Sequence, residues 1–176
     1  MLKTEYLFLR DFLDTDWTMV HEYASDVEVV RYQEWGPNTE AETKDFVRRA
    51  IASGRESPRR NHELAIVLSQ TGLPVGGCGI YVSNPSNREG YIGYCINRTY
   101  WGQGYATEAA RALLEFGFVH LGLHRIFATC DPANTASARV LEKAGMLREG
   151  HLREHKWAKG RWRDSFLYGI LETDKR

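Results

Sequence analysis

The organisation of this chain can be read from Trp101-Gly102-Gln103-Gly104-Tyr105-Ala106-Thr107-Glu108-Ala109-Ala110. Its two glycines stand directly before a run of good helix formers, which predicts a tight turn into a helix. The unpaired N–H groups of such a turn point outward together at the positive end of the helix dipole, and this arrangement binds phosphate. The stretch therefore predicts a site for a phosphate-bearing ligand. The alternative is an ordinary helix start whose glycines allow close packing.

A strand precedes this turn and a long helix follows it. Tyr91-Ile92-Gly93-Tyr94-Cys95-Ile96 mixes aromatic and β-branched residues, which favours a strand. From Tyr105 to Leu121 the apolar residues recur at helical spacing, and small residues in the first turns allow close packing on a sheet. Working outward, the sequence predicts further helices from 17 to about 30, from 39 onward and over 134–144, and further strands over 6–10, 63–68, 75–82, 125–130, 147–157 and 164–171.

The chain shows no internal repeat, linker or low-complexity tract. At 176 residues it fits one domain, and we expect a single mixed α/β (α+β) domain over residues 1–176. It contains 23 Lys plus Arg and 23 Asp plus Glu, so its formal charge is zero. This balance gives no electrostatic footprint for nucleic acid or an anionic membrane, and we expect neither as a partner.

Two further features concern the cellular compartment and metals. No apolar run approaches the ~20 residues that span a bilayer, and the first residues lack the apolar centre of a signal peptide, so we expect a cytoplasmic protein. Cys78, Cys95 and Cys130 are odd in number, lack C-x-x-C spacing and lie in strand-like runs, which favours buried free thiols. The histidines also lack metal-ligand spacing, and we expect no metal site.

Several groups of residues together resemble the GNAT acyltransferase superfamily. They are the turn Trp101 to Ala106 after a strand ending near Ile96, the motif Asn134-x-x-Ser137, and Val140-Leu141-Glu142-Lys143-Ala144-Gly145-Met146. The segments Thr4 to Arg10 and Lys159 to Asp164 are similar to the branch of this superfamily that contains the ribosomal-protein N-acetyltransferases, which act on protein N-termini. The resemblance covers nearly the whole chain.

The resemblance implies a mostly antiparallel, twisted sheet that is splayed open at its centre, with helices on both faces and acetyl-CoA as the acetyl donor. The pantetheine arm would pair with the backbone near Ile96, and the pyrophosphate would rest on the amides of the turn. Trp101 stands where the family has Gln or Arg, and we expect only a flanking contact to change. The resemblance thus assigns acetyl-CoA binding to Ile96, Gly102, Gln103, Gly104, Tyr105, Ala106, Thr107 and Asn134.

In such a site a neutral amine attacks a thioester, and alignment of the two reactants supplies much of the acceleration. A backbone N–H near Ile96 would polarise the carbonyl. Many family members protonate the leaving sulfur with a tyrosine, but Leu141 stands at the matching position. Ser137, one turn earlier on the same predicted helix, is the hydroxyl left for this catalytic role. Its alternative role is hydrogen bonding at the helix N-terminus.

The general base has several candidates. A residue that is often glutamate in this branch corresponds here to Tyr91, and Glu89 precedes it on the same face of the predicted strand. Glu89 would accept the amine proton directly or through water, and its alternative role is that of a solvated strand end. His155, Glu154 and Glu34 are further candidates that the sequence does not rank.

Tyr32, Trp35 and Tyr91 are the candidates for contacts with the acceptor, and packing is their alternative role. If aromatic residues line a narrow channel, the acceptor is a protein or peptide N-terminal α-amine, such as that of a ribosomal protein, or a similarly narrow amine. The zero net charge argues against a dedicated polyamine enzyme, whose acceptor would favour an acidic channel.

The function that these residues favour is acetyl-CoA-dependent N-acetylation by direct transfer in a ternary complex. A small-molecule amine (polyamine, amino acid or antibiotic) is the alternative acceptor, and a non-catalytic acyl-CoA sensor is the alternative function. A dinucleotide-binding oxidoreductase is disfavoured, because the third glycine of its fingerprint is missing after Gly102 and Gly104. The sequence leaves open a monomer or a homodimer, and acetyl or a longer acyl group.

Overall fold

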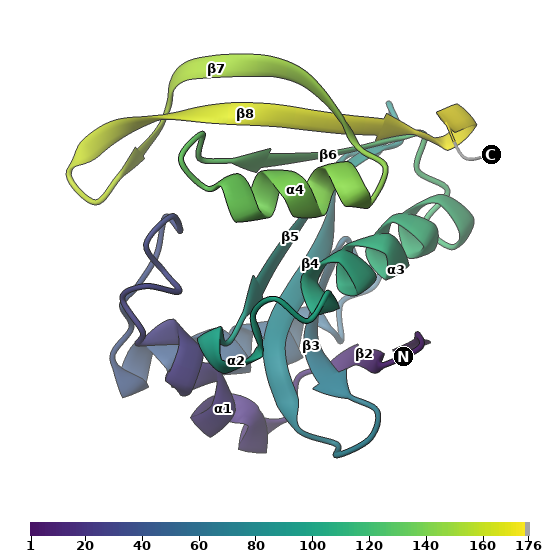
Figure 1. Cartoon of the computed structure of the whole chain (residues 1–176). Helices are drawn as coiled ribbons and strands as arrows, with labels where there is room; N and C mark the ends of the chain where they lie inside the picture. The colour runs from purple at the N-terminus through teal and green to yellow at the C-terminus, as the bar shows by residue number, and fades with distance from the viewer. Residues whose placement is uncertain (175–176) are drawn as a thin grey trace.

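A mixed sheet of eight strands, in the order β1-β2-β3-β4-β5-β6-β8-β7, runs through the molecule in the computed structural model, which describes residues 1–174 (Figure 1). The strands are β1 (Leu2–Lys3), β2 (Leu7–Asp11), β3 (Asn61–Leu68), β4 (Pro74–Asn84), β5 (Glu89–Ile96), β6 (Arg125–Cys130), β7 (Leu147–Ala158) and β8 (Arg161–Leu171). The helices are α1 (Trp17–Ala24), α2 (Glu40–Ser53), α3 (Tyr105–Val119) and α4 (Thr135–Lys143).

The sheet is antiparallel except between β5 and β6, which are parallel. Their pairing covers only Glu89 with Arg125, Gly90 with Ile126 and Tyr91 with Phe127, and the ladder stops there. In Figure 1, β6, β7, β8 and α4 accordingly form an upper part of the molecule that is joined to the rest along β5. The prediction of a mostly antiparallel sheet that is splayed at its centre is confirmed.

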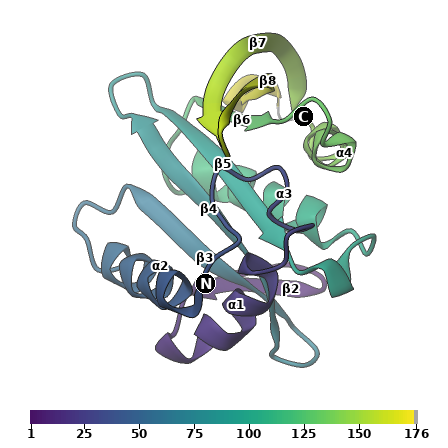
Figure 2. The same ribbon diagram turned by 90° about the vertical axis from the view of Figure 1, so that its left-hand side faces the viewer.

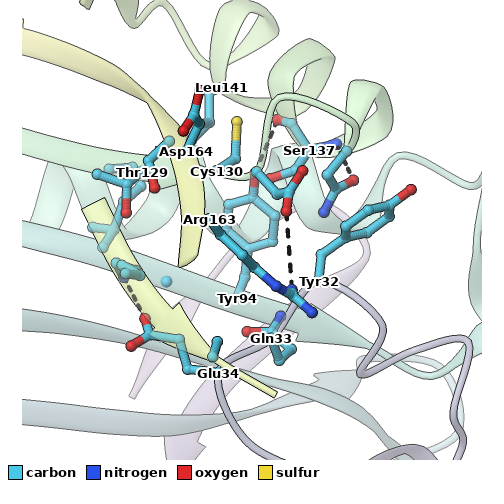
Figure 3. A pocket seen from close by; sticks show the side chains of 18 residues that line it. Tyr32, Gln33, Glu34, Tyr94, Thr129, Cys130, Ser137, Leu141, Arg163 and Asp164 are labelled. Atoms are coloured by element: carbon cyan, nitrogen blue, oxygen red, sulfur yellow. Dashed lines mark hydrogen bonds and ion pairs between the residues drawn. The ribbon is translucent and has the colours of Figure 1, made fainter. Parts of the chain in front are cut away.

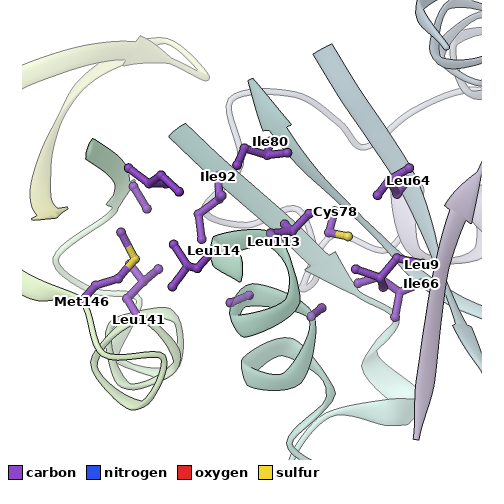
Figure 4. Close-up of a cluster of buried hydrophobic side chains, with 14 of the residues drawn as sticks. Leu9, Leu64, Ile66, Cys78, Ile80, Ile92, Leu113, Leu114, Leu141 and Met146 are labelled. Atoms are coloured by element: carbon purple, nitrogen blue, oxygen red, sulfur yellow. The ribbon is translucent and has the colours of Figure 1, made fainter. Parts of the chain in front are cut away.

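Helices cover both faces of the sheet because alternate strand residues are apolar on each face. Ile66 on β3 points to the face that α3 covers, where Leu113 and Leu114 pack on the sheet and Met146 joins them from the end of α4 (Figure 4). The neighbouring Ala65 points to the opposite face and lies in the cluster of apolar residues contributed by α1 and α2. Two cores therefore hold the sheet from its two sides.

Local signals in the sequence explain where two of these elements begin and turn. Thr39 is the N-cap of α2: its hydroxyl accepts from the Glu42 backbone N–H, and the Glu42 carboxylate accepts from the Thr39 backbone N–H. This is the predicted capping sequence. Between β7 and β8, Lys159 and Gly160 have φ angles of 51° and 76°, the left-handed values that a two-residue hairpin turn requires.

The first helix is shorter than the sequence predicts. The apolar spacing predicts a helix from 17 to about 30, but α1 ends at Ala24. The Asp26 side chain accepts from the Glu28 backbone N–H, and this local bond competes with continuation of the helix. Residues 25–39 are instead irregular, and in Figure 2 this segment rises from α1 toward β7 and β8.

Within residues 1–174, no helix is both long and apolar enough to cross a membrane. The sheet has no doubly wound parallel core, which disfavours the oxidoreductase alternative on structural grounds.

Candidate active site

The parting of β5 from β6 leaves part of the β5 backbone facing a cleft. The Asn97 N–H donates to the Val75 carbonyl, so Tyr94 and Ile96, which alternate with Asn97, direct their own N–H and C=O groups away from β4. Among residues 1–174, no strand pairs with them on that side, because the ladder to β6 has already ended. The Ile96 carbonyl accepts from the Trp101 indole Nε1 at 2.8 Å, which ties the glycine turn to the end of β5.

The turn into α3 has the geometry that its glycines predict. Gly102 and Gly104 have φ angles of 78° and 85°, and Gly104 is the N-cap of α3. A Cβ atom at either position would meet nothing within 4 Å, so their outer side is open. Gln103 is exposed between them, and Tyr105, Ala106 and Thr107 form the first turn of the helix, half-buried. These residues present the backbone amides of a helix start to solvent next to the cleft.

A cavity of about 120 Å³ occupies the cleft itself (Figure 3). Its walls come from β5, β6, the first turns of α4, the β7–β8 hairpin and the segment 32–34. The lining includes Tyr32, Gly93, Tyr94, Cys130, Asn134, Ser137, Leu141, Arg163 and Ser165. We call it the cleft cavity. Of the residues named from the sequence, Tyr32, Asn134, Ser137 and the candidate base Glu34 are brought together here.

A hydroxyl pair spans the cleft cavity between β5 and α4. The Tyr94 and Ser137 hydroxyl oxygens lie 3.0 Å apart, and the Tyr94 hydroxyl also donates to the Ser137 carbonyl. Burial raises the pKa of Tyr94, so its hydroxyl is neutral at physiological pH. The Asn134 side chain accepts from the Ser137 backbone N–H and caps α4. Ser137 thus takes part in the helix N-terminus and also presents its hydroxyl to the cleft.

Tyr94 is not among the site residues predicted from the sequence. The sequence pattern could have indicated it, because Tyr94 lies two residues before Ile96 on a strand predicted to border the cleft. The sequence does not show that α4 packs close to β5, and this packing brings the Tyr94 hydroxyl to Ser137. Leu141, at the position of the family tyrosine, is 1% exposed and lines the same cavity with an apolar side chain.

A second, larger cavity of about 620 Å³ lies on the face of the sheet that α1 and α2 cover. We call it the helix-side cavity. It shares Gln33, Gly93 and Tyr94 with the cleft cavity, so the two meet at the edge of β5. The rest of its lining includes Phe12, Val20, Tyr23, Trp35, Glu42, Phe46, Arg49, Glu63, Gly77, Cys78, Gly79, Tyr81 and Cys95. Trp35, a predicted acceptor contact, lines this cavity.

Glu63 lines this cavity and is not among the site residues predicted from the sequence. Burial raises its pKa, and a hydrogen bond from Tyr81 and the charge of Arg49 partly oppose that rise. The Tyr81 hydroxyl donates to Glu63 Oε1 at 3.3 Å. Tyr81 in turn stacks on Tyr91, with ring centroids 4.7 Å apart. Tyr91 lines neither cavity and is 39% exposed, so it reaches the site through its contact with Tyr81.

Glu89 lies away from both cavities. It is at the start of β5, where the β5–β6 ladder is still closed, and its carboxylate lies 3.5 Å from Arg125 Nε. The structure thus does not bring the base expected from the sequence to Ser137. Glu89 and Ile96 lie at opposite ends of the eight-residue strand β5. The alternation that places Glu89 and Tyr91 on one face does not determine which end of the strand faces the cleft.

Two of the other base candidates, Glu34 and His155, have side-chain partners. Glu34 forms an ion pair with Lys156, and Glu154 is an exposed residue with a φ of 48° in the irregular part of β7. His155 Nδ1 lies 3.0 Å from the hydroxyl of Ser165, a buried residue that lines the cleft cavity. His155 therefore contacts the cavity only through Ser165.

The β7–β8 hairpin holds the irregular segment between α1 and α2. Lys159 Nζ donates to the Val30 carbonyl at 2.6 Å, and Arg163 Nη1 donates to the Arg31 carbonyl at 3.2 Å. In Figure 3, Arg163 extends into the cleft cavity between Tyr94 and Tyr32. Its Nε is buried without a hydrogen-bond partner among the described residues. These contacts close the cleft cavity on the side of the segment 32–34.

The described part of the chain contains no group of three or more His, Cys, Asp and Glu side chains placed to hold a metal ion. The three cysteines are free, as predicted: Cys78 and Cys130 are buried and Cys95 is half-buried.

Comparison with known proteins agrees with this architecture. The family model described as an acetyltransferase (GNAT) domain matches residues 6–147. An uncharacterized N-acetyltransferase of Bacillus subtilis, YnaD, is 35% identical over 173 residues, which cover 98% of each chain. A solved structure of a GNAT-family acetyltransferase from Bacillus anthracis has a TM-score of 0.87 and 38% identity, and 98% of each chain is covered.

Similarity to the ribosomal-protein branch is more limited in extent. The alanine N-acetyltransferase of ribosomal protein uS5 from Escherichia coli is 31% identical over 84 residues, which cover 48% of this chain and 43% of that enzyme. The family-model match and the full-length match to YnaD cover more of the chain than this partial match does. On these grounds the chain belongs to the GNAT family and is an N-acetyltransferase that uses acetyl-CoA.

Proposed function

We propose that this protein transfers an acetyl group from acetyl-CoA directly to a primary amine at the place where the cleft cavity and the helix-side cavity meet. The observation that carries this proposal is the shared lining of the two cavities by Gln33, Gly93 and Tyr94. A donor in one cavity and an acceptor in the other would approach each other there without a covalent enzyme intermediate. Holding two reactants in register supplies on the order of 7–11 kcal/mol of such a barrier.

The donor half of the proposal uses the open backbone groups. The pyrophosphate binds the amides of Gly102, Gln103, Gly104, Tyr105, Ala106 and Thr107, where the positive end of α3 favours an anion. The pantetheine arm lies along β5 and hydrogen-bonds to the backbone of Tyr94 and Ile96, as a strand would. The Asn134 side chain, whose oxygen caps α4, offers its NH₂ group to the same arm.

The residues around the meeting point supply the chemistry. A β5 backbone N–H that faces the cleft polarises the thioester carbonyl, because it is fixed in place before the reaction. The Ser137 hydroxyl, hydrogen-bonded to Tyr94, donates a proton to the leaving sulfur. Tyr32 lines the cleft cavity and Trp35 the helix-side cavity, so acceptor contacts are proposed for both.

Two acceptor classes have separate support. A protein or peptide N-terminal α-amine, including that of a ribosomal protein, is supported by the partial similarity to the uS5-alanine N-acetyltransferase. A small-molecule amine is supported by the helix-side cavity, whose volume of about 620 Å³ is that of a site for a small ligand.

The test is release of the CoA thiol from acetyl-CoA across a panel of N-terminal peptides, amino acids, polyamines, apolar amines and aminoglycosides. Turnover above background hydrolysis with one class supports the proposal and identifies the acceptor. Binding of acetyl-CoA in the same samples without turnover on any acceptor would contradict it and favour a non-catalytic acyl-CoA sensor.

A further inference from the structure

Three residues lie side by side across the floor of the helix-side cavity. The register pairs Glu63 on β3 with Gly79 on β4, and Gly79 with Gly93 on β5. The Cα atoms of Glu63 and Gly93 are therefore two strand spacings, about 10 Å, apart, and both residues face the same side of the sheet. Neither glycine has a side chain to fill the interval, and Gly93 belongs to both cavities. No side chain of these two glycines therefore separates the carboxylate from the edge of the cleft.

Tyr81 lies over this path. A Cβ atom built at Gly79 would be 2.5 Å from the Tyr81 hydroxyl oxygen, so the hydroxyl occupies the space above Gly79. The same hydroxyl donates to Glu63, and its ring is held by stacking on Tyr91. The hydroxyl thus lies above the residue that separates Glu63 from Gly93, and Gly79 must lack a side chain for this arrangement to form.

The carboxylate of Glu63 supplies the negative charge on the floor of this cavity. The titratable groups that face it are Arg49 from α2, Tyr23 from α1, Tyr81 from β4 and Tyr91 from β5. Arg49 is 71% exposed and forms an ion pair with Asp45, so its charge is largely solvated. Glu42, the other acid in the lining, is exposed and caps α2. The remaining walls are mainly aromatic or apolar: Phe12, Val20, Tyr23, Trp35 and Phe46.

We propose that the helix-side cavity binds the acceptor as a primary ammonium ion on an apolar body, with Glu63 as its counter-ion and, through Tyr81, as the base that deprotonates it. This inference rests on the proposed function and names the acceptor class and the base within it. An apolar body matches the aromatic walls, and the half-buried carboxylate of Glu63 matches a single ammonium group. A polyamine would place further charges against Phe12 or Phe46, and the other carboxylate in the lining, Glu42, is exposed and already accepts hydrogen bonds from Thr39.

The proton and electron balance closes with these groups. The ammonium gives one proton to the Tyr81 hydroxyl as that hydroxyl gives its own to Glu63, or gives it to Glu63 directly. The freed lone pair forms the C–N bond to the acetyl carbon, and the C–S bond breaks with its electron pair on sulfur. A second proton moves from nitrogen to sulfur through Ser137, so that the products are the amide and the CoA thiol. Glu63 then returns its proton to water.

The experiment measures acetyl transfer to 2-phenylethylamine as a function of pH in wild type, Glu63→Gln and Tyr81→Phe. Glu115→Gln on the exposed side of α3 is the matched control, since it removes the same charge away from both cavities. We expect Glu63→Gln to lower kcat/KM by about 100-fold or more, the range of general base catalysis. Acetyl-CoA affinity should change less than about twofold in every variant, which also shows that each is folded.

The pH profile separates a base from a structural residue. Glu63 accepts a proton only when ionised, so kcat/KM should rise as pH rises through its raised pKa, and this acid limb should disappear in Glu63→Gln. The hydrogen bond from Tyr81 lowers the pKa of Glu63, so its removal in Tyr81→Phe should move the acid limb to higher pH. A residue that only supports the fold would not move the limb.

The outcomes separate this inference from the function on which it rests. Activity in wild type with an unchanged rate and acid limb in Glu63→Gln would overturn Glu63 as the base while N-acetylation stands. Preference for spermidine over 2-phenylethylamine and apolar-headed peptides would overturn the acceptor class. No turnover on any amine, with acetyl-CoA bound, would overturn the proposed function and this inference with it. Relative rates on 2-phenylethylamine and on peptides with an apolar first residue distinguish the two sources of such an ammonium.

Discussion

The hydroxyl oxygens of Tyr94 and Ser137 lie 3.0 Å apart across the cleft, one on β5 and the other on α4. A hydrogen bond therefore joins β5 to α4 beyond the point where the pairing of β5 with β6 ends. Leu141, one turn along α4 from Ser137, contributes no proton donor. If the Tyr94 hydroxyl donates to the Ser137 carbonyl, the Ser137 hydroxyl donates to Tyr94 and can turn instead toward a sulfur in the cleft.

Ser137→Ala should lower kcat by on the order of 10²-fold, the lower end of the effect of a general acid. Acetyl-CoA affinity should change little, because the proposed phosphate and pantetheine contacts are made by backbone groups and by the Asn134 side chain, not by the Ser137 hydroxyl. Steady-state kinetics and calorimetry of acetyl-CoA binding measure the two quantities. Thr135→Ala, an exposed position in the first turn of the same helix, is the control. An equal loss in both variants would assign the effect to α4 stability.

Gly104→Val should abolish acetyl-CoA binding, because Gly104 has a φ of 85° and its added side chain would stand where the pyrophosphate is proposed to lie. The left-handed conformation also costs a valine roughly 1–2 kcal/mol. Gly160→Val, at a φ of 76° in the β7–β8 turn, carries the same conformational cost without facing the turn into α3. Calorimetric titration with acetyl-CoA and thermal unfolding compare them. Equal acetyl-CoA affinity in Gly104→Val and wild type would defeat this placement of the site.

Lys159→Met should raise the KM of the acceptor by about three- to tenfold while acetyl-CoA affinity is unchanged. The reason is loss of the hydrogen bond from Lys159 Nζ to the Val30 carbonyl, which holds the segment that carries Tyr32 and Trp35. Hydrogen bonds from charged groups contribute on the order of 1.5 kcal/mol, less when solvent reaches them. Lys3→Met, an exposed position on β1, is the control. An unchanged acceptor KM would show that the hairpin does not order this segment.

The three cysteines should react slowly with a disulfide reagent in the native protein at pH 8. Burial raises the pKa of Cys130 to about 11 and that of Cys95 to about 12, and it raises the pKa of Cys78 further, so thiolates are scarce. Cys130 lines the cleft cavity, and acetyl-CoA should therefore slow its labelling more than that of Cys78. Mass spectrometry of labelled peptides with and without acetyl-CoA reports each rate. Fast labelling of any one thiol at neutral pH would contradict its burial.

Structural features that depend on only a few neighbouring residues could be predicted from the sequence. The Thr39 capping box and the glycine turn at Gly104 depend on bonds within one turn of helix, and both appear as predicted. The resemblance supplied the longer-range arrangement, including the opening beside Ile96. The predicted helix of residues 17–30 was wrong beyond Ala24, because the Asp26 side chain makes a local hydrogen bond that apolar spacing does not report.

The candidate base shows what the sequence did not provide. Glu63 reads as an ordinary polar residue near the start of a strand, and only the register across three strands places it in line with Gly79 and Gly93. From the sequence, Glu89 is an equally good candidate for the base, yet it lies beside Arg125 at the end of β5 that is paired with β6. Which carboxylate faces the cleft depends on strand pairing between distant segments, and neither residue type nor spacing carries that information.

The single parallel contact in the sheet has a consequence for solubility. Where β5 and β6 separate, each presents a row of unpaired backbone groups, and unprotected strand edges are templates for aggregation between chains. Here the two edges face each other inside one molecule, under α4 and beside the segment held by Lys159 and Arg163. The strand edge proposed for the pantetheine arm is thus enclosed within one molecule and does not lie at an outer edge of the sheet.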